Sequence, residues 1–185
     1  MQTQLVERAR SGDREAFGVL AAGAIDRLYG IARLILRDAE LAEDATQEAL
    51  IRAWRDLPTL RDVERFDAWL YRLIVRASAD VGRHRRRWRA EVSLVHHEPS
   101  EPDRQSALAD RDLIERGLRR LTDSQQSILV LHFYVGLSPS ETADALDIPV
   151  GTAKSRLHYA IEALRAAMAA DERSLVEAAR EGRMA

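Results

Sequence analysis

Four residues able to contact nucleic acid fall on one face of a predicted helix in the C-terminal half of the chain. They are Lys154, Ser155, His158 and Tyr159. Ala153 and Leu157 fall on the opposite, apolar face. A helix fits the DNA major groove, where Lys and Ser side chains can reach base edges and phosphates. We therefore predict a DNA-recognition helix, with Thr152 at its start near a phosphate and Arg156 on its flank against the DNA backbone.

The segment before this helix predicts the element that positions it. Ser138-Pro139-Ser140-Glu141 is a capping box with proline at the first helical position. Asp147-Ile148-Pro149 then predicts a tight turn, because proline cannot continue the preceding helix. The alternative is an ordinary helical hairpin exposed to solvent. Cap, turn and polar face together favour a helix-turn-helix over residues 136–157.

A second candidate surface combines aromatic and arginine side chains in the first half of the chain. Trp69, Arg72, Arg76 and Arg83 are spaced to share one helix face, and residues 85–89 add four arginines and a tryptophan. Rings that stack on bases and guanidinium groups that hold phosphates suit a single strand of nucleic acid. A partly buried core tryptophan followed by a solvated helix end explains the same residues equally well, so both interpretations stay open.

A third pattern is a stripe on the predicted helix over residues 43–54. Asp44, Gln47, Glu48 and Ile51 share one face, opposite a row of alanines. An isoleucine beside carboxylates and an amide is a candidate protein-binding stripe. From these residues alone, an acidic face exposed to solvent is the default interpretation.

Neither catalysis nor metal binding is supported by the residue pattern. His96 and His97 are adjacent in a predicted linker, and the other three histidines are scattered. The sequence contains no glycine-rich phosphate loop, nucleophile elbow or His-Glu-x-x-His motif. We expect no enzyme activity, no metal and no cofactor.

Composition bounds the class of protein and its partners. The 185 residues include no cysteine, which fits a reducing cytoplasm, and no apolar run reaches the length of a membrane helix. Residues 1–13 are too polar for a signal peptide. Residues 1–90 carry a net charge of +3 and residues 91–185 carry −5. Because a self-sufficient DNA binder usually has a strongly basic surface, this balance suggests that DNA binding depends on a larger partner.

Apolar periodicity predicts an all-α fold of two small helical domains joined by a flexible acidic linker. Helices are expected from Phe17 to Ile35, from Asp38 to before Pro58, and from about Asp67 into the arginines. The predicted parts are a domain over 1–90, a linker over 91–106, a helix-turn-helix domain over 107–170 and a charged tail over 171–185. The last helix is expected to bury Val150 and to run to about Ala170, with the tail either helical or frayed.

The three motifs, in this order, resemble a bacterial RNA polymerase sigma factor of the extracytoplasmic-function (ECF) class. The resemblance covers roughly residues 5–168. It rests on residues 42–48 (Ala-Glu-Asp-Ala-Thr-Gln-Glu), residues 66–73 (Phe-Asp-Ala-Trp-Leu-Tyr-Arg-Leu) and residues 148–157 (Ile-Pro-Val-Gly-Thr-Ala-Lys-Ser-Arg-Leu).

The resemblance implies a transcription initiation factor with no catalytic step of its own. It implies that the linker threads the polymerase active-site and RNA-exit path, and that an anti-sigma protein holds the factor inactive. It implies core RNA polymerase binding by Asp44, Gln47, Glu48, Ile51 and Arg52. It implies −10 recognition and melting by Arg61, Arg65, Phe66, Trp69, Arg72, Arg76 and Arg83, with residues 58–66 as the loop that captures a flipped base. It implies −35 recognition by Thr152, Lys154, Ser155, Arg156, His158 and Tyr159.

Four residues depart from the family pattern. Arg76 stands where Asn is frequent, Leu50 where Phe is frequent, Asp147 where Gly is common at the turn, and Tyr159 where a basic residue is common. Two other functions compete with the sigma-factor hypothesis. One is a stand-alone helix-turn-helix regulator, against which the Trp69 face and the lack of a sensor domain argue. The other is an adaptor that binds polymerase without reading a promoter, against which the recognition helix argues.

Overall fold

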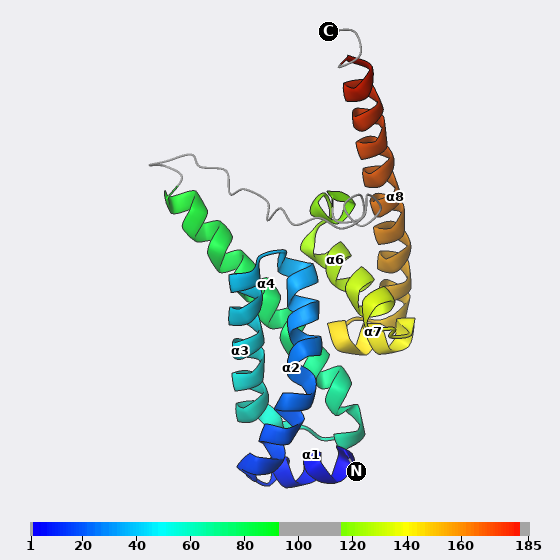
Figure 1. The fold of residues 1–185 in the computed structure, drawn as a ribbon. Helices are drawn as coiled ribbons and strands as arrows, with labels where there is room; N and C mark the ends of the chain where they lie inside the picture. The colour runs from blue at the N-terminus through cyan, green and yellow to red at the C-terminus, as the bar shows by residue number, and fades with distance from the viewer. Residues whose placement is uncertain (1, 93–115, 182–185) are drawn as a thin grey trace.

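Every element of the computed structural model is helical in the residues it describes, 2–92 and 116–181. The α-helices are α1 (Gln2–Arg10), α2 (Arg14–Leu36), α3 (Ala39–Asp56), α4 (Phe66–Val92), α6 (Asp123–Leu129), α7 (Pro139–Leu146) and α8 (Val150–Glu181). Two 3₁₀ turns, η1 (Leu57–Thr59) and η2 (Val63–Arg65), lie before α4, and a π-helical segment, η3 (Val130–Tyr134), follows α6. The prediction of an all-α fold with two helical regions is confirmed (Figure 1). Of the predicted linker, residues 91–92 belong to α4, and the rest lies outside the described residues.

Small side chains bring α3 close to its neighbours. Ala42, Ala45, Ala49 and Ala53 recur at three- and four-residue steps, and all are fully buried. Larger residues of α2 and α4, Leu28, Ile31, Leu70 and Ile74 among them, fill the space between the three helices. The predicted start at Asp38 holds, because its side chain accepts a hydrogen bond from the Leu41 N–H of α3. Helix α2 begins at Arg14, before the predicted Phe17, and Asp13 caps it.

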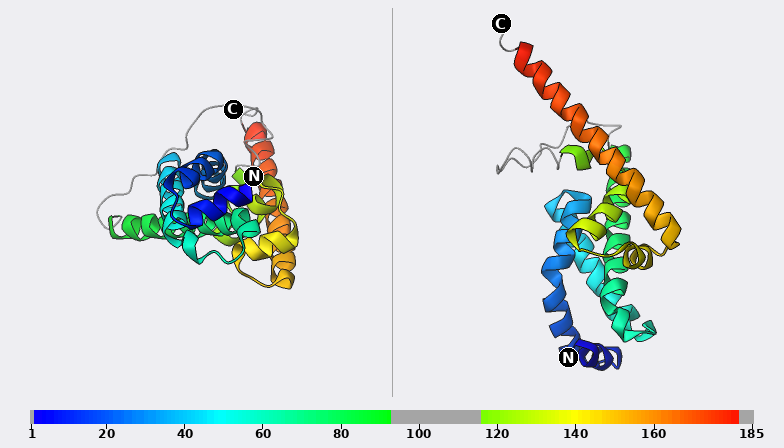
Figure 2. Two further views of the ribbon diagram at one scale, coloured as in Figure 1. Left: turned by 90° about the horizontal axis from the view of Figure 1, so that it is seen from below. Right: turned by 90° about the vertical axis from the view of Figure 1, so that its right-hand side faces the viewer.

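Helix α1 was not predicted. It buries only Val6 and Ala9 among polar residues, a pattern too short to reveal periodicity. It packs across one end of α2 and against η1 and η2, so its burial depends on the tertiary structure (Figures 1 and 2).

The helix-turn-helix is capped as the sequence predicts. In the boxes that begin α6 and α7, Thr122 pairs with Gln125 and Ser138 with Glu141, each through reciprocal side-chain and backbone hydrogen bonds. Gly136 has a φ of +83°, and Asp147 ends α7 in the left-handed region with a φ of +58°. These conformations set the direction of the chain on either side of α7.

Two predictions about α8 need correction. Val150, the first residue of the helix, is 40% exposed and not buried. The helix does not end near Ala170 but continues to Glu181, beyond the body of the molecule (Figure 2). Asp171 anchors the helix there through ion pairs with Arg116 and Arg120.

The two helical regions lie against each other. Val130, Leu131 and Ala145 of the second region belong to the same buried cluster as the residues of α2, α3 and α4. Helix α7 packs along α4, and η3 packs on α2 (Figures 1 and 2). A second cluster, with Ile128, Ala143, Ala153 and Ala160, forms the interior of the helix-turn-helix itself.

Ser138→Ala should lower the free energy of unfolding by about 1 kcal/mol, because it removes the N-cap of α7. Urea denaturation followed by circular dichroism measures the change. The matched control is Ser140→Ala, an exposed serine within the same helix. Equal stability of the two variants would show that the cap does not hold α7.

Candidate nucleic-acid interface

The recognition face predicted on α8 is exposed. Lys154, Ser155, Arg156, His158 and Tyr159 all lie on the solvent side of the helix, and Thr152 is partly buried at its first turn. Ala153 and Ala160 are buried against the rest of the helix-turn-helix. The structure therefore brings the six predicted residues together along the first three turns of α8.

Two contacts organise this face. The Ser155 hydroxyl donates to the Thr152 carbonyl oxygen at 3.0 Å. The His158 and Tyr159 rings meet edge to face with centroids 5.6 Å apart, and Tyr159 is 67% exposed. Lys154 and Arg156 thus supply the positive charge of the face, and the aromatic pair forms its far end.

The arginine face of α4 lies against the C-terminal end of α7. Arg76 Nη2 is 3.0 Å from Asp147 Oδ2. Beside this face, Arg65 at the end of η2 places its Nη1 3.2 Å from Asp144 Oδ2. Arg72 donates to the backbone carbonyl oxygen of Asp144 at 2.6 Å, and its other terminal nitrogen is 4.0 Å from Asp147. Three arginines predicted to hold a DNA strand are thus bound by two residues of the helix-turn-helix.

Sequence reasoning did not identify Asp144 and Asp147 as partners of these arginines. The available signal was that Arg76 and Asp147 both depart from the family pattern. In the structure these two departures form an ion pair with each other. Helical periodicity cannot predict an ion pair between residues 71 positions apart, because the contact depends on how the two regions pack.

The other predicted −10 residues are not arranged uniformly. Phe66 is almost fully buried, with its ring 5.9 Å from that of Trp69, so it supports the face from beneath. Trp69 is partly buried and packs against the core. This fits the interpretation of Trp69 as a partly buried core residue. Arg61 is exposed in the segment between η1 and η2. Arg83 pairs with Asp80, one turn before it on α4.

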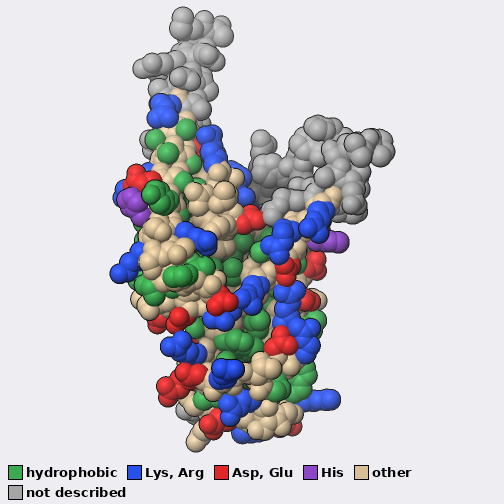
Figure 3. All heavy atoms as spheres, turned by 180° about the vertical axis from the view of Figure 1, so that it is seen from behind, with side chains coloured by type: hydrophobic (Ala, Val, Ile, Leu, Met, Phe, Trp, Pro, Cys, Tyr) green, Lys and Arg blue, Asp and Glu red, His purple; other side chains and the backbone are tan. Residues whose placement is uncertain are grey.

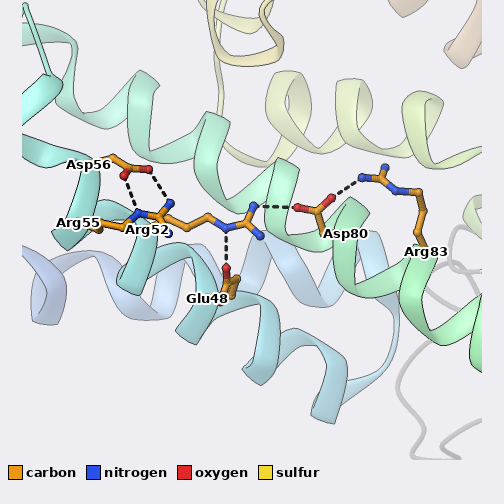
Figure 4. Close-up of polar contacts among 6 residues, drawn as sticks. All are labelled: Glu48, Arg52, Arg55, Asp56, Asp80 and Arg83. Atoms are coloured by element: carbon orange, nitrogen blue, oxygen red, sulfur yellow. Dashed lines mark hydrogen bonds and ion pairs between the residues drawn. The ribbon is translucent and has the colours of Figure 1, made fainter.

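The α3 stripe is exposed as predicted, apart from one internal contact. Asp44, Gln47 and Ile51 lie on the surface, and Ile51 is 60% exposed. Arg52 instead joins α3 to α4: its Nε is 2.7 Å from Glu48 and its Nη1 is 2.8 Å from Asp80 (Figure 4). The hydrogen bond to Asp80, and then that to Glu48, raise the pKa of the Arg52 guanidinium. Arg52 thus holds the helix that presents Ile51.

Basic and acidic side chains are interspersed over the face shown in Figure 3, with no continuous basic patch. This agrees with the net charge of −2 and with dependence on a larger partner for DNA affinity. Within residues 2–92 and 116–181, no cluster of three potential metal ligands occurs. In the same ranges, no helix combines the length and apolarity that crossing a membrane requires.

Two family models match the chain, in the order that the motifs predict. Sigma-70 region 2 matches residues 23–90, and Sigma-70 region 4 matches residues 117–166. The RNA polymerase sigma-H factor of Pseudomonas aeruginosa is 33% identical over 89% of this chain and 92% of its own length. The chain belongs to the extracytoplasmic-function class of RNA polymerase sigma factors.

Other relatives and solved structures agree with this assignment. The sigma factor is 36% identical to ECF sigma factor SigL of Mycobacterium tuberculosis, over 75% of this chain and 80% of SigL. The structure resembles that of CnrH in complex with the cytosolic domain of CnrY, with a TM-score of 0.67, 27% identity and coverage of 92% and 98% of the two chains. It shares its fold with the sigma factor RpoE of Bartonella quintana, solved with the anti-sigma factor NepR, at a TM-score of 0.66 and 23% identity over 84% and 98% of the two chains.

Family membership confirms the predicted function in transcription initiation. A stand-alone helix-turn-helix regulator is not favoured, because the region 2 match covers α4 and most of the other helices in the first half of the chain.

Arg52→Gln should lower the free energy of unfolding of the sigma factor by about 1 kcal/mol, because it removes both charge-assisted contacts between α3 and α4. Urea denaturation again measures the loss. Arg55→Gln is the control, since the Arg55 ion pair joins it to the next residue of its own helix, Asp56. A loss of similar size in both variants would contradict a bridging role for Arg52.

Proposed function

We propose that the sigma factor divides promoter recognition between its two regions. Residues 1–90 bind core RNA polymerase and recognise and melt the −10 element, and residues 107–170 read the −35 element. The exposed polar face of α8 is the observation that carries the second assignment, because no element of the described residues covers it. The exposed stripe of α3 and the arginine face of α4 support the first.

In this proposal each surface has a separate partner. Asp44, Gln47, Glu48 and Ile51 contact core polymerase, and Arg52 holds their helix in place. Arg61, Arg65, Trp69, Arg72, Arg76 and Arg83 contact the displaced −10 strand, and Phe66 supports them from the core. The α8 residues Thr152, Lys154, Ser155, Arg156, His158 and Tyr159 contact duplex DNA at −35.

The chemistry of initiation then belongs to the polymerase, and the sigma factor contributes binding alone. The protein is proposed to act in the cytoplasm, without enzymatic activity of its own. An anti-sigma protein is proposed as its regulator, because the structures it resembles were solved with CnrY and with the anti-sigma factor NepR.

Reconstituted initiation tests the proposal. Purified protein is mixed with core RNA polymerase and a library of promoter sequences, and transcript start sites are sequenced. The proposal expects starts downstream of a shared two-part motif. Tight duplex binding by the protein alone, with no promoter-specific transcript, would indicate a stand-alone regulator. Polymerase binding without promoter selection would indicate an adaptor.

Lys154→Ala should weaken recognition of the −35 element by about 1–3 kcal/mol if Lys154 contacts a base edge. Holoenzyme binding to promoter DNA, measured with wild-type and scrambled −35 sequences, separates specific from non-specific loss. Arg165→Ala is the control, because it removes the same charge from an exposed position farther along α8. A loss that is equal on both sequences would make Lys154 a phosphate contact.

Ile51→Ala should weaken binding to core polymerase at least about tenfold, as truncation of an interface hot spot does. Fluorescence anisotropy of labelled sigma factor titrated with core polymerase gives the dissociation constant. Val19→Ala is the matched control, since Val19 is exposed to a similar extent on α2. Unchanged affinity of the Ile51 variant would remove the α3 stripe from the polymerase interface.

A further inference from the structure

The arginine face of α4 is occupied within the molecule. The groups that occupy it are the two carboxylates at the end of α7, Asp144 and Asp147, together with the Asp144 backbone carbonyl. We propose that these groups form an internal latch that masks the −10 binding site until the two regions separate. This inference rests on the proposed function of Arg65, Arg72 and Arg76, and its test distinguishes the two.

The latch and a DNA strand compete for the same arginine side chains. A phosphate bound at this face competes for the guanidinium N–H groups that Arg76 directs at Asp147 and that Arg72 directs at the Asp144 carbonyl. The short distances of 3.0 and 2.6 Å leave no room for a phosphate between donor and acceptor. Binding a strand at these residues therefore requires α7 to move away from α4.

The strength of the contacts suits a latch that opens. The Arg76–Asp147 and Arg65–Asp144 pairs are roughly half exposed on both sides, and such pairs are weak and screened by salt. Buried apolar residues add to them, since Val130, Leu131 and Ala145 share the core of the first region. The closed arrangement thus combines a modest apolar contact with a charged contact that nucleic acid can replace.

The left-handed turn at the end of α7 does not by itself favour aspartate at position 147. Its φ of +58° is a conformation in which glycine is less strained than aspartate. The aspartate side chain extends to Arg76 and Arg72, so its presence at this position strengthens the contact between the two regions. The same side chain reaches no residue of α8 that is predicted to contact DNA.

A second contact between the two regions joins η3 to α2. The Tyr134 hydroxyl lies directly over Gly30 of α2, where an added Cβ would collide with it. Gly23, on the same helix, has open space around the equivalent position. A side chain as large as leucine at residue 30 must displace the exposed Tyr134 ring, and it should therefore weaken the contact of η3 with α2 without changing any charge.

The test measures the distance between the two regions in the free, full-length protein. The chain has no cysteine, so Glu43→Cys on α3 and Ala166→Cys on α8, both exposed, accept spin labels selectively. Double electron–electron resonance then gives the fractions of closed and open molecules. Asp144→Asn with Asp147→Asn should raise the open-to-closed ratio about three- to tenfold, since three weak ion pairs are lost. Asparagine tolerates the left-handed turn, which keeps α7 intact.

Two matched controls accompany these variants. Glu162→Gln removes a carboxylate from the same region, where it pairs within α8, and should leave the distances unchanged. Gly30→Leu should increase the open fraction as the charge variants do, whereas Gly23→Leu should not. Distances that stay at the wild-type values in both the double asparagine variant and Gly30→Leu would overturn the latch.

The consequence for DNA is measured with a fluorescein-labelled 12-nucleotide oligo(dT) by anisotropy. Both opening variants should bind it about three- to tenfold more tightly than the wild type and the two controls. Opening without tighter binding would overturn masking of the DNA site. Failure of the proposed function itself appears elsewhere, as absence of promoter-specific initiation by the reconstituted wild type.

Discussion

The guanidinium N–H groups of Arg72 and Arg76 that point at α7 can hold only one partner at a time. In this structure the partner is the end of α7, through two carboxylates and a backbone carbonyl. In transcription initiation the proposed partner is a DNA strand, whose phosphates need the same donors. The position of α7 on α4 and the accessibility of the proposed −10 face therefore depend on the same charged contacts.

The rest of the first region makes that face rigid. Fully buried alanines allow α3 to lie close to α2 and α4, and Phe66 supports Trp69 from the core. Arg52 ties α3 to α4 through Asp80, which also receives Arg83 (Figure 4). The exposed stripe of α3 and the arginine face are thus presented by two helices fixed to each other.

Sequence patterns predicted the helices and their caps because both are local. The alanine row of α3 and the capping box at Ser138 both follow from residues within a few positions of one another. Helix α1, the length of α8 and the π-helical segment Val130–Tyr134 were missed or left open, since tertiary contacts decide them. The exposed α8 face was predicted in full, again from periodicity.

The contacts between the regions could not be predicted in this way. Arg76 and Asp147 each looked like an unexplained departure from the family pattern, because they lie 71 residues apart in the sequence. Only the packing of α7 on α4 shows that they belong together. Family resemblance describes what the chain shares with its relatives, whereas this pair is a property of the chain itself.

The most direct measurement is the distance between labels on α3 and α8 of the wild-type sigma factor, before and after core RNA polymerase and promoter DNA are added. A single closed population in the free protein that lengthens in the promoter complex is the result expected from one arginine face shared by α7 and DNA. An unchanged distance in a complex that initiates transcription would contradict this account.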